Sequence, residues 1–561
     1  MKRTRQILTL VLAALLLITC AACQTTPGQT TTAATTAATT APSTTAATEA
    51  QPAMTAAGNP AVAFPLPETE TFELMIKGNG TTYGDVNEWA QKNKFWQDLF
   101  ERTNVQIDFT YLGEDVVATL NAKFASGTAG DAIPISNGLN DAQVAQFGAS
   151  GMLAELESYV RDPELMPNLH KNAAAYSPTF MGVMTAPNGH MYSLASYDAF
   201  APNFLESAVL INKEWLKAAG METPTTTDEL YEALVYFRDH DMNGNGNIND
   251  EVPVLLYANS TGYTSLPALM CMWGIATKAS ELDSYVMVND GKVDFVPTME
   301  NFKDALRTIG RWYSEGLIWS EAYTCTGETF SAMLKSPEPI IGMYTYTSLP
   351  SESYKDQYEF IAPPSGDGYK PCVFMHPGLA GNKNMFFVNA KCENIPVLMA
   401  WVDNFYDLDD GYALQYNYPG EGRLELTADG KYNPLPITSD EAAKLNEKNP
   451  AMYTLTSFQV RARNADDYAS RIVKSPAQEA KELIYNLYVE TGVLNDEIWP
   501  RPYFREEDAT RLGELRTDIF SIVSIQSAKW GTGQGNIDEE WDAYVAQLEA
   551  AGIEEYVELC Q

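Results

Sequence analysis

The sequence Asp241-Met-Asn-Gly-Asn-Gly-Asn-Ile-Asn-Asp-Glu251 places an oxygen-bearing side chain at every second position from Asp241 to Asn249. A hard cation such as Ca²⁺ takes about six to eight oxygen ligands, and alternate residues of a tight loop can all face one centre. Gly246 stands where the helix–loop–helix calcium loop needs a sharp turn. We therefore predict a structural calcium site with ligands drawn from Asp241, Asn243, Asn245, Asn247, Asn249, Asp250 and Glu251.

The end of this loop departs from the usual calcium pattern. Its twelfth position, where a bidentate Glu is expected, is Val252, so Asn249, Asp250 or Glu251 must close the site. Without a metal, the same residues would form a solvated turn rich in Asn, Asp and Gly. In both cases the loop is structural, because Asn-rich ligation leaves little charge for Lewis-acid chemistry.

Helices and strands alternate on both sides of the loop. Residues 227–240, directly before it, combine Thr227 as a cap, Glu229 in the first turn and apolar residues at helical spacing. The alternation predicts an α/β protein with mostly parallel sheets. Further strands are expected at 71–77, 105–112 and 210–213, and further helices at 87–103, 115–126, 215–220, 396–406, 477–491, 506–527 and 538–548.

The amino terminus indicates export. Basic residues precede the apolar run Ile7–Ile18, which is too short to span a bilayer. Small residues then precede Cys23, as in the lipobox of bacterial lipoproteins, so residues 1–23 are expected to be a lipoprotein signal peptide with Cys23 as the lipidated residue. An ordinary secretory signal peptide cleaved nearby is the alternative. Residues 24–65, rich in Thr and Ala, are expected to form a disordered tether.

Charge and cysteine content restrict the function of the body. A formal net charge of −36 argues against nucleic acid and anionic lipid as partners. Five cysteines follow the signal peptide, none at metal-binding spacing. An odd number cannot all pair internally, and one bridge, such as Cys372–Cys392, remains open.

Several runs of sequence occur in an order that resembles a known family: Ala125-Ser-Gly-Thr-Ala-Gly-Asp131, Asn188-Gly-His-Met-Tyr-Ser-Leu-Ala195, Ile211-Asn-Lys-Glu-Trp-Leu-Lys-Ala-Ala-Gly220, Pro224-Thr-Thr-Thr-Asp-Glu-Leu230, and Gly531-Thr-Gly with Trp541 and Tyr544. Together they resemble the family 1 extracellular solute-binding proteins, the lipid-anchored receptors of bacterial ABC sugar importers. Large members that bind oligosaccharides carry a similar calcium loop after the fourth run.

The resemblance implies an α/β fold of the periplasmic-binding-protein-like type II, with two lobes, a hinge and a ligand cleft between the lobes. The ligand would then shift the population toward a closed form by touching both lobes. On this basis we expect an N-lobe first segment at 66–200, a C-lobe first segment at 201–338, an N-lobe return segment at 339–395, and a mainly helical second C-lobe segment at 396–561.

The resemblance also implies the partners and the location. The expected ligand is a carbohydrate, more specifically an oligosaccharide, and the expected protein partner is the permease of an ABC transporter. Neither catalysis nor nucleic-acid binding is expected, and the protein is expected to be a monomer. It should be lipid-anchored on the extracellular face of the cell membrane of a bacterium, of the Gram-positive kind.

Aromatic rings offer stacking platforms for sugars, and strand ends of α/β sheets are where ligands bind. Core packing is the competing role for each such aromatic, and Trp312 and Trp401 are expected in the core because they lie on helical stripes. The residues expected at the cleft are Tyr83, Trp89, Asp131, Tyr197, Asp198, Trp273, Tyr344, Tyr346 and His376.

Two other functional classes remain open. A secreted carbohydrate-active enzyme needs two opposed carboxylates, and 73 acidic residues make chance pairs common. The sequence has no Gly-x-Ser-x-Gly, no His-Glu-x-x-His and no P-loop, and its four histidines are widely spaced. A receptor that feeds a sensor kinase would share the same closing mechanism, so the sequence does not separate signalling from transport.

Overall fold

The computed structural model describes residues 53–77, 85–135, 138–177, 179–205, 207–260, 264–277, 285–347, 349–351, 353–375, 383–435, 459–495, 497–499 and 504–561. The predicted signal peptide, Cys23, Tyr83 and His376 lie outside these residues. Among the described helices, none has the length and hydropathy that crossing a membrane requires.

The first sheet has four strands in the order β11-β3-β1-β2. β1 runs parallel to β2, with Glu70 opposite Val105 and Ile76 opposite Tyr111. β1 is also parallel to β3, whereas β11 is antiparallel to β3. The strands span Glu70–Ile76 (β1), Val105–Tyr111 (β2), Ala132–Pro134 (β3) and Phe386–Val388 (β11).

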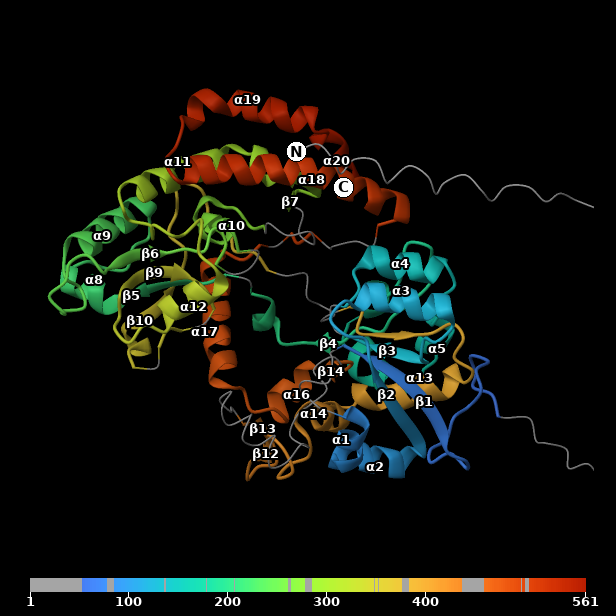
Figure 1. Ribbon diagram of the computed structural model, residues 1–561. Coiled ribbons are helices and arrows are strands. Elements are labelled where there is room, and N and C mark those ends of the chain that lie inside the picture. Colours follow the sequence, from blue (N-terminus) through green and yellow to red (C-terminus); the bar gives the residue numbers. More distant parts are fainter. Residues whose placement is uncertain are drawn as a thin grey trace, which may run out of the picture. The chain divides into compact units, whose positions relative to one another are not determined.

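The side chains of β1 divide this sheet between two layers of helices. Phe72, Leu74 and Ile76 face a core built with α1, α2 and α13, and Met75 faces the core beneath α3 and α4. Alternate residues of a strand point to opposite faces, so an apolar strand with this pattern is covered on both sides (Figure 1). These helices span Val86–Lys92 (α1), Lys94–Thr103 (α2), Val116–Ser126 (α3), Asp141–Ala149 (α4) and Ile395–Asp403 (α13).

The second sheet has the order β10-β5-β9-β6. β5 is antiparallel to both β10 and β9, and only β6 and β9 run parallel. The expectation of mostly parallel sheets is therefore wrong for this half of the protein, because alternation along the chain does not fix strand direction. The strands span Val209–Asn212 (β5), Val252–Leu255 (β6), Ile341–Thr345 (β9) and Tyr358–Ile361 (β10).

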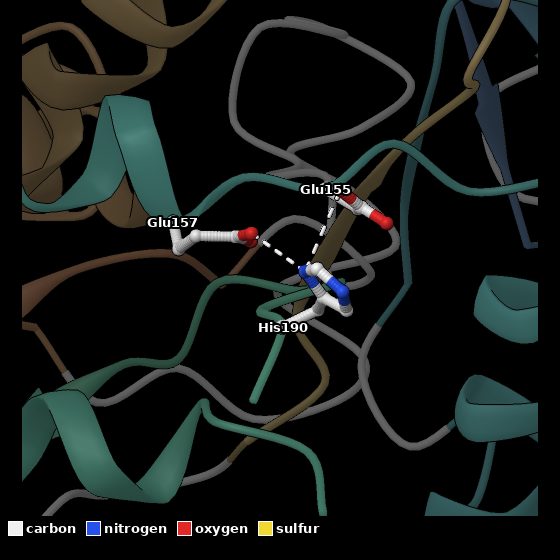
Figure 2. A group of neighbouring side chains, drawn as sticks. All are labelled: Glu155, Glu157 and His190. Carbon is white, nitrogen blue, oxygen red and sulfur yellow. Dashed lines mark hydrogen bonds and ion pairs between the residues drawn. The ribbon is translucent and has the colours of Figure 1, made fainter. Parts of the chain in front are cut away.

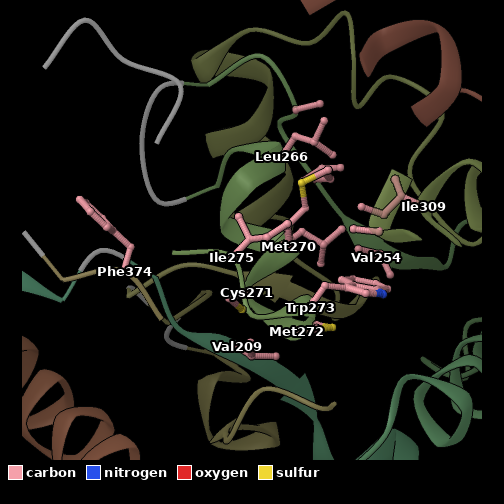
Figure 3. Close-up of a cluster of buried hydrophobic side chains, with 14 of the residues drawn as sticks. Val209, Val254, Leu266, Met270, Cys271, Met272, Trp273, Ile275, Ile309 and Phe374 are labelled. Atoms are coloured by element: carbon pink, nitrogen blue, oxygen red, sulfur yellow. The ribbon is translucent and has the colours of Figure 1, made fainter. Parts of the chain in front are cut away.

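A large apolar core surrounds the second sheet. Trp273 and Trp312 are fully buried in it, and Trp273 lies among Val254, Met270 and Met272 in Figure 3. The long carboxy-terminal helix α18 packs against α11 (Figure 1). The helices of this core span Lys213–Ala219 (α8), Thr227–Asp239 (α9), Leu266–Leu269 (α10), Glu300–Ser314 (α11), Gly327–Leu334 (α12), Pro476–Thr491 (α17), Glu506–Gly531 (α18), Ile537–Ala550 (α19) and Ile553–Cys560 (α20).

Three two-stranded sheets and several short helices complete the described part. β4 and β14 are parallel, whereas the pairs β7–β8 and β12–β13 are antiparallel. The strands span Tyr197–Asp198 (β4), Val286–Asn289 (β7), Lys292–Phe295 (β8), Leu424–Leu426 (β12), Tyr432–Pro434 (β13) and Ala462–Arg463 (β14). The helices span Glu157–Val160 (α5), Pro167–Leu169 (α6), His170–Ala174 (η1), Phe180–Val183 (α7), Ala201–Phe204 (η2), Met270–Trp273 (η3), Val296–Thr298 (η4), Lys355–Gln357 (η5), Asn404–Tyr406 (η6), Leu408–Tyr416 (α14) and Ala465–Ser470 (α16).

The chain passes between the two cores after β4, between β10 and β11, and after β14. The predicted lobe boundaries at 339–395 and 396–561 are therefore wrong. β9 and β10 pair with β5 in the second sheet, and residues from Val397 to Ala462 pack in the first core. The sequence of a strand does not specify which sheet the strand joins. Likewise, the apolar face of α13 does not specify which of the two cores it packs against.

The body also begins earlier than predicted. Residues 53–65 were expected to belong to the tether, yet Thr55 and Asn59 are buried and both donate hydrogen bonds to Oδ2 of Asp162, at 2.5 and 2.8 Å. Buried side chains with charged partners anchor this segment, although its Ala-rich composition resembles that of the residues before it.

Several local expectations are confirmed with small corrections. Asp115 caps α3 and Gly127 ends it with φ of 68°. The helix expected at 87–103 is broken at Asn93, whose side chain caps α2. The cap of α9 is Thr226 rather than Thr227, in a capping box with Glu229. Trp312 and Trp401 are in the core, as predicted.

The Cys372–Cys392 bridge, which the sequence left open, does not fit this fold. Cys392 is buried in the first core, whereas Cys372 packs against the second, where its N–H donates to the carbonyl of Cys271 at 2.9 Å. The two residues are close in sequence, but the chain passes from the second core to the first between them, where β11 joins the first sheet.

Candidate functional site

The Asn-rich loop follows α9 as a series of side-chain-to-backbone hydrogen bonds. The Asp241 carboxylate accepts from the N–H groups of Gly244, Asn245 and Gly246 at 2.8–3.1 Å. Asn243, Asn245 and Asn247 each accept, through Oδ1, from the N–H two residues later. Gly244 and Gly246 have φ of 77° and 88°, a left-handed conformation that suits glycine.

Two carboxylates at the end of the loop have buried oxygens that lack a donor. Within the described residues, Oδ1 of Asp250 and Oε2 of Glu251 are buried without a hydrogen-bond partner. Burial raises the pKa of Glu251, although its other oxygen accepts from the N–H of Met242 at 2.9 Å. An unpartnered buried carboxylate oxygen is costly unless a cation compensates it. The residues present therefore fit a Ca²⁺ ion.

One further acidic residue joins the loop, and sequence reasoning missed it. Glu338, from the segment before β9, accepts from Nδ2 of Asn245 at 2.8 Å, and the same amide donates to Asp250 at 2.7 Å. Glu338 lies far from the loop in sequence, so no local spacing rule could find it. Glu338 thereby holds the side chain of Asn245 in the orientation in which Oδ1 of Asn245 accepts within the loop.

Most aromatic residues predicted for the cleft are in the cores. Trp89 and Tyr197 are buried in the first core, and Trp273 and Tyr344 in the second. Trp273 also donates through Nε1 to Asp367 at 2.8 Å. A ring without exposed faces offers no stacking platform, so these residues are corrected to core positions. Tyr346 is half-buried at the edge of the second core, in edge contact with Phe330.

Asp131 is a structural residue in this fold. Its Oδ2 accepts from the N–H of Glu73 at 2.9 Å, and its carbonyl accepts from the N–H of Asn389 at 2.9 Å. From its place directly before β3, it therefore joins Glu73 within β1 to Asn389 directly after β11. The prediction that it faces the ligand is not supported by these contacts.

Asp198 is the predicted residue that lies in a polar cluster. It ends β4, where the chain leaves the first core, and its Oδ1 accepts from the hydroxyl of Tyr468 and the N–H of Phe200, both at 3.0 Å. Tyr468 stands on α16, directly after β14, and its ring stacks on Phe200 at 5.0 Å. Tertiary folding thus gathers two of the segments that connect the cores around one carboxylate.

Two arginines lie beside this carboxylate. Arg461 and Arg463 flank Ala462 of β14, which pairs with Tyr197, and both guanidinium groups donate to Oε1 of Gln415 on α14. The guanidinium of Arg463 lies 4.9 Å from the ring centre of Tyr412. In the described part of the chain, the Nε atoms of both arginines are buried without a hydrogen-bond partner. We refer to Asp198, Tyr412, Gln415, Arg461, Arg463 and Tyr468 as the crossing cluster.

The two buried guanidinium groups of the crossing cluster have pKa shifts of opposite direction, because burial lowers both but the neighbouring Tyr412 and Tyr468 raise the pKa of Arg463. Burial lowers the pKa of Arg461 to about 10, and the neighbouring charge of Arg463 lowers it further in the same direction. Both guanidinium groups donate to the one neutral amide of Gln415, and Asp198 is the carboxylate whose charge lies near them. A carboxylate acceptor, guanidinium donors and aromatic rings in one place are the groups that recognise hydroxyl-rich ligands. The run Arg461-Ala-Arg463 is the sequence feature that could have predicted this cluster, since alternate arginines in a buried strand require buried partners.

A second polar group lies elsewhere in the first core region (Figure 2). Nδ1 of His190 lies 2.6 Å from Oε1 of Glu157 and 3.4 Å from Oε2 of Glu155. The hydrogen bond with Glu157 raises the pKa of His190. The same Glu157 side chain accepts from the N–H of Met191 at 3.1 Å. These contacts describe an ion pair that fixes the turn before Met191.

Comparison with known proteins tests the resemblance to extracellular solute-binding proteins. The fructooligosaccharide ABC transporter substrate-binding protein FusA of Streptococcus pneumoniae is 28% identical over 517 residues, covering 89% of this chain and 91% of FusA. The resemblance to ABC transporter solute-binding proteins is confirmed. No protein-family model matches the chain.

Solved structures confirm the fold of this chain as the two-lobed type II class. FusA of S. pneumoniae in complex with kestose has a TM-score of 0.69 at 24% identity, over 88% of this chain and 98% of FusA. An extracellular solute-binding protein from Bifidobacterium longum subsp. infantis has a TM-score of 0.74 at 22% identity, over 91% of this chain and 98% of that chain.

Two further similarities concern the metal and the anchor. A FusA structure described as an EF-hand mutant, in complex with fructo-nystose, has the same fold, with a TM-score of 0.69 at 24% identity over 88% of this chain and 98% of that chain. Lipoprotein LipO of Bacillus subtilis is 25% identical over 233 residues, 41% of this chain and 42% of LipO. These relatives are binding proteins or lipoproteins by name, and none is named as an enzyme.

Proposed function

We propose that this solute-binding protein captures an oligosaccharide outside the cell and delivers it to the permease of an ABC transporter. The crossing cluster is the observation that carries the proposal. It combines the Asp198 carboxylate with the guanidinium groups of Arg461 and Arg463, at segments that connect the two cores. Sugar hydroxyls both donate and accept, so a ligand of this class satisfies both kinds of group at once.

The relatives support an oligosaccharide as the ligand class. FusA is named for fructooligosaccharides, and its structures contain kestose and fructo-nystose. In the two-lobed mechanism, the ligand stabilises the closed form by contacts that the open form lacks. Asp198 and Arg463 stand on crossing segments, so contacts there are sensitive to the motion that closes the lobes. No bond-breaking step is part of the proposal.

The metal and the anchor complete the proposed arrangement. Ca²⁺ held by the Asn-rich loop, with Asp250 and Glu251 as its closing carboxylates, would supply the charge that their buried oxygens lack. Lipidation of Cys23 would keep the monomeric body at the outer face of the membrane, and the similarity to LipO supports this location. The transport partner would be the permease, which receives the closed, loaded form.

Ligand binding by the purified protein tests the proposal. Thermal-shift and calorimetric titrations would use kestose, longer neutral fructans and an acidic galacturonan, because a ligand that binds only the native state raises the melting temperature. We expect a neutral oligosaccharide to raise the melting temperature and to be recovered intact. Absence of any shift across the panel contradicts oligosaccharide capture. Release of shorter sugars in proportion to protein concentration would instead favour the alternative function, a secreted carbohydrate-active enzyme.

A further inference from the structure

The Asn-rich loop lies at the amino end of two neighbouring strands of the second sheet. It ends at Glu251, directly before β6, and Glu338 lies shortly before β9. β6 and β9 pair in parallel, with Val252 opposite Ile341 (Figure 1). The N–H of Val252 also donates to the carbonyl of Ile340 at 2.7 Å. The loop and Glu338 therefore meet where the two strands begin.

The side chain of Asn245 joins the loop to the segment before β9. Its Nδ2 donates to Oε2 of Glu338 at 2.8 Å and to Oδ2 of Asp250 at 2.7 Å. Its Oδ1 accepts from the N–H of Asn247 at 2.8 Å. A carboxylate only accepts hydrogen bonds, so the nitrogen must be the end of the amide that faces Glu338 and Asp250. The two carboxylates thereby fix the orientation of the Asn245 amide.

This orientation matters for a cation. Ca²⁺ binds oxygen, and an Asn side chain that is turned over would offer it an NH₂ group instead. Asp250 has its own candidate ligand atom, since its Oδ1 is buried without a partner in the described part of the chain. Glu338 is exposed and holds the amide from outside the loop. Removal of a group that orients a metal ligand in this way typically weakens metal binding by about 10–100-fold.

The segment that carries Glu338 is held by its own hydrogen bonds. The N–H of Glu338 donates to Oγ of Ser336 at 3.3 Å, and its carbonyl accepts from the N–H of Ile340 at 3.0 Å. The carbonyl of Ser336 accepts from the hydroxyl of Tyr354 at 2.9 Å, and Tyr354 is buried in the second core. Glu338 is therefore presented to the loop by backbone that is tied to the core.

We propose that Glu338 is a positioning residue for the calcium site. It holds the Asn245 amide in the orientation that offers its oxygen to Ca²⁺, and bound Ca²⁺ in turn ties the amino end of β9 to that of β6. The inference rests on the proposed calcium site and adds a residue from outside the loop. The coupling is reciprocal, because a contact that strengthens Ca²⁺ binding is itself strengthened by Ca²⁺.

Calorimetric titration of the calcium-free, full-length protein with CaCl₂ tests this role. Glu338→Ala removes the acceptor, whereas Glu338→Gln keeps an acceptor oxygen for the same amide. The control is Glu232→Ala, which removes an exposed glutamate of α9 in the same lobe. We expect Glu338→Ala to weaken Ca²⁺ binding about 10-fold, the lower end of the range for such partners. Glu338→Gln should recover most of this loss, and Glu232→Ala should bind Ca²⁺ like the wild type.

Two further measurements separate positioning from a purely structural role. In chelator, Glu338→Ala and the wild type should melt at the same temperature, whereas a fixed Ca²⁺ concentration should raise the melting temperature of the variant less, because stabilisation depends on the ratio of free Ca²⁺ to Kd. Hydrogen exchange of the β9 amides should slow on addition of Ca²⁺ in the wild type, and less so in Glu338→Ala. A fall in melting temperature of equal size with and without Ca²⁺ would overturn the inference.

The titrations also separate this inference from the proposed calcium site. If the wild type binds no Ca²⁺, both fail. If the wild type binds Ca²⁺ and both Glu338 variants bind it equally tightly, the calcium site stands and the positioning role is overturned. If Glu338→Gln loses as much affinity as Glu338→Ala, the charge of the carboxylate acts and not its hydrogen bond, which also overturns the positioning role.

Discussion

The hydroxyl of Tyr468 donates to the carboxylate of Asp198 at 3.0 Å, although the two residues are 270 positions apart in sequence. Asp198 ends β4 and Tyr468 lies on α16, so the bond joins two segments through which the chain leaves the first core. The ring of Tyr468 also stacks on Phe200, the second residue after Asp198. A ligand that binds this carboxylate therefore acts on both segments at once.

Replacement of Asp198 by Asn is expected to weaken oligosaccharide binding. A hydrogen bond to a charged group contributes about 1.5–3 kcal/mol, so the affinity should fall by about 10-fold or more. The fold should survive, because the Asn oxygen can still accept from the N–H of Phe200. Asp466→Asn is the matched control, since Asp466 is exposed and bonded to Tyr176. Equal affinities of both variants and the wild type, measured by calorimetry, would exclude Asp198 from the ligand site.

Removal of calcium is expected to lower the thermal stability of the protein. A ligand present at 100 times its Kd stabilises the native state by about 2.7 kcal/mol. Scanning calorimetry in a chelator should therefore give a lower melting temperature than in added Ca²⁺. Asp250→Asn should abolish most of this difference, whereas Asp228→Asn, on the exposed start of α9, should retain it. An unchanged melting temperature in chelator would leave the loop as a metal-free turn.

His190 is expected to stabilise the fold at mildly acidic pH. Its pKa is raised by the hydrogen bond with Glu157, so its contribution is complete below the ordinary histidine pKa, about 6.5. That contribution is lost as the pH rises through the elevated native value. His190→Gln should therefore be destabilising at pH 6 and close to neutral at pH 9, in denaturant titrations at each pH. An equal loss at both values would contradict the ion pair.

Asp403 is expected to give a pH dependence of the same sign in a more acidic window. Burial raises its pKa to about 7, although its carboxylate accepts from the N–H groups of Asn168 and Leu169 at 2.9 and 2.8 Å. The native state therefore binds a proton that the unfolded state has released between pH 4 and 7, so stability falls as pH rises through this window. Asp403→Asn should flatten this part of the stability curve. A variant with the wild-type slope would show that Asp403 does not titrate there.

Trp273 is expected to act through the core and not through ligand stacking. It is fully buried, and a Cβ on Gly366 would lie 2.5 Å from its ring. Trp273→Ala should cost about 3–5 kcal/mol in unfolding free energy. The milder Trp273→Phe should retain the sugar affinity of the wild type. Loss of affinity in a stably folded Trp273→Phe protein would restore Trp273 as a ligand contact.

The residues that sequence reasoning placed correctly are governed by local rules. The start of α3 at Asp115 and its end at Gly127 follow from capping chemistry, which involves only neighbours in the chain. The Asn-rich loop is equally local, because its side chains bond to N–H groups two to five residues away. Trp312 and Trp401 were assigned to the core from helical periodicity alone, and both are buried.

The failures share a different cause. Trp273 and Tyr344 follow the same local patterns as ligand-facing aromatics, yet they are buried because strands distant in sequence close over them. β9 and β10 were assigned to the wrong lobe, because pairing with β5 is a choice between sheets that no single strand encodes. Arg461 and Arg463 were overlooked because their shared partner, Gln415, comes from another segment.

The sequence by itself determined the class of protein, the loop that can hold calcium and the order of its helices and strands. Those features depend on short-range geometry and on runs of residues that stay together along the chain. Only the tertiary structure decided which strands share a sheet, which aromatics are covered, and that Asp198 bonds to Tyr468. The physical reason is that burial and ion pairing depend on long-range contacts, which a linear pattern does not specify.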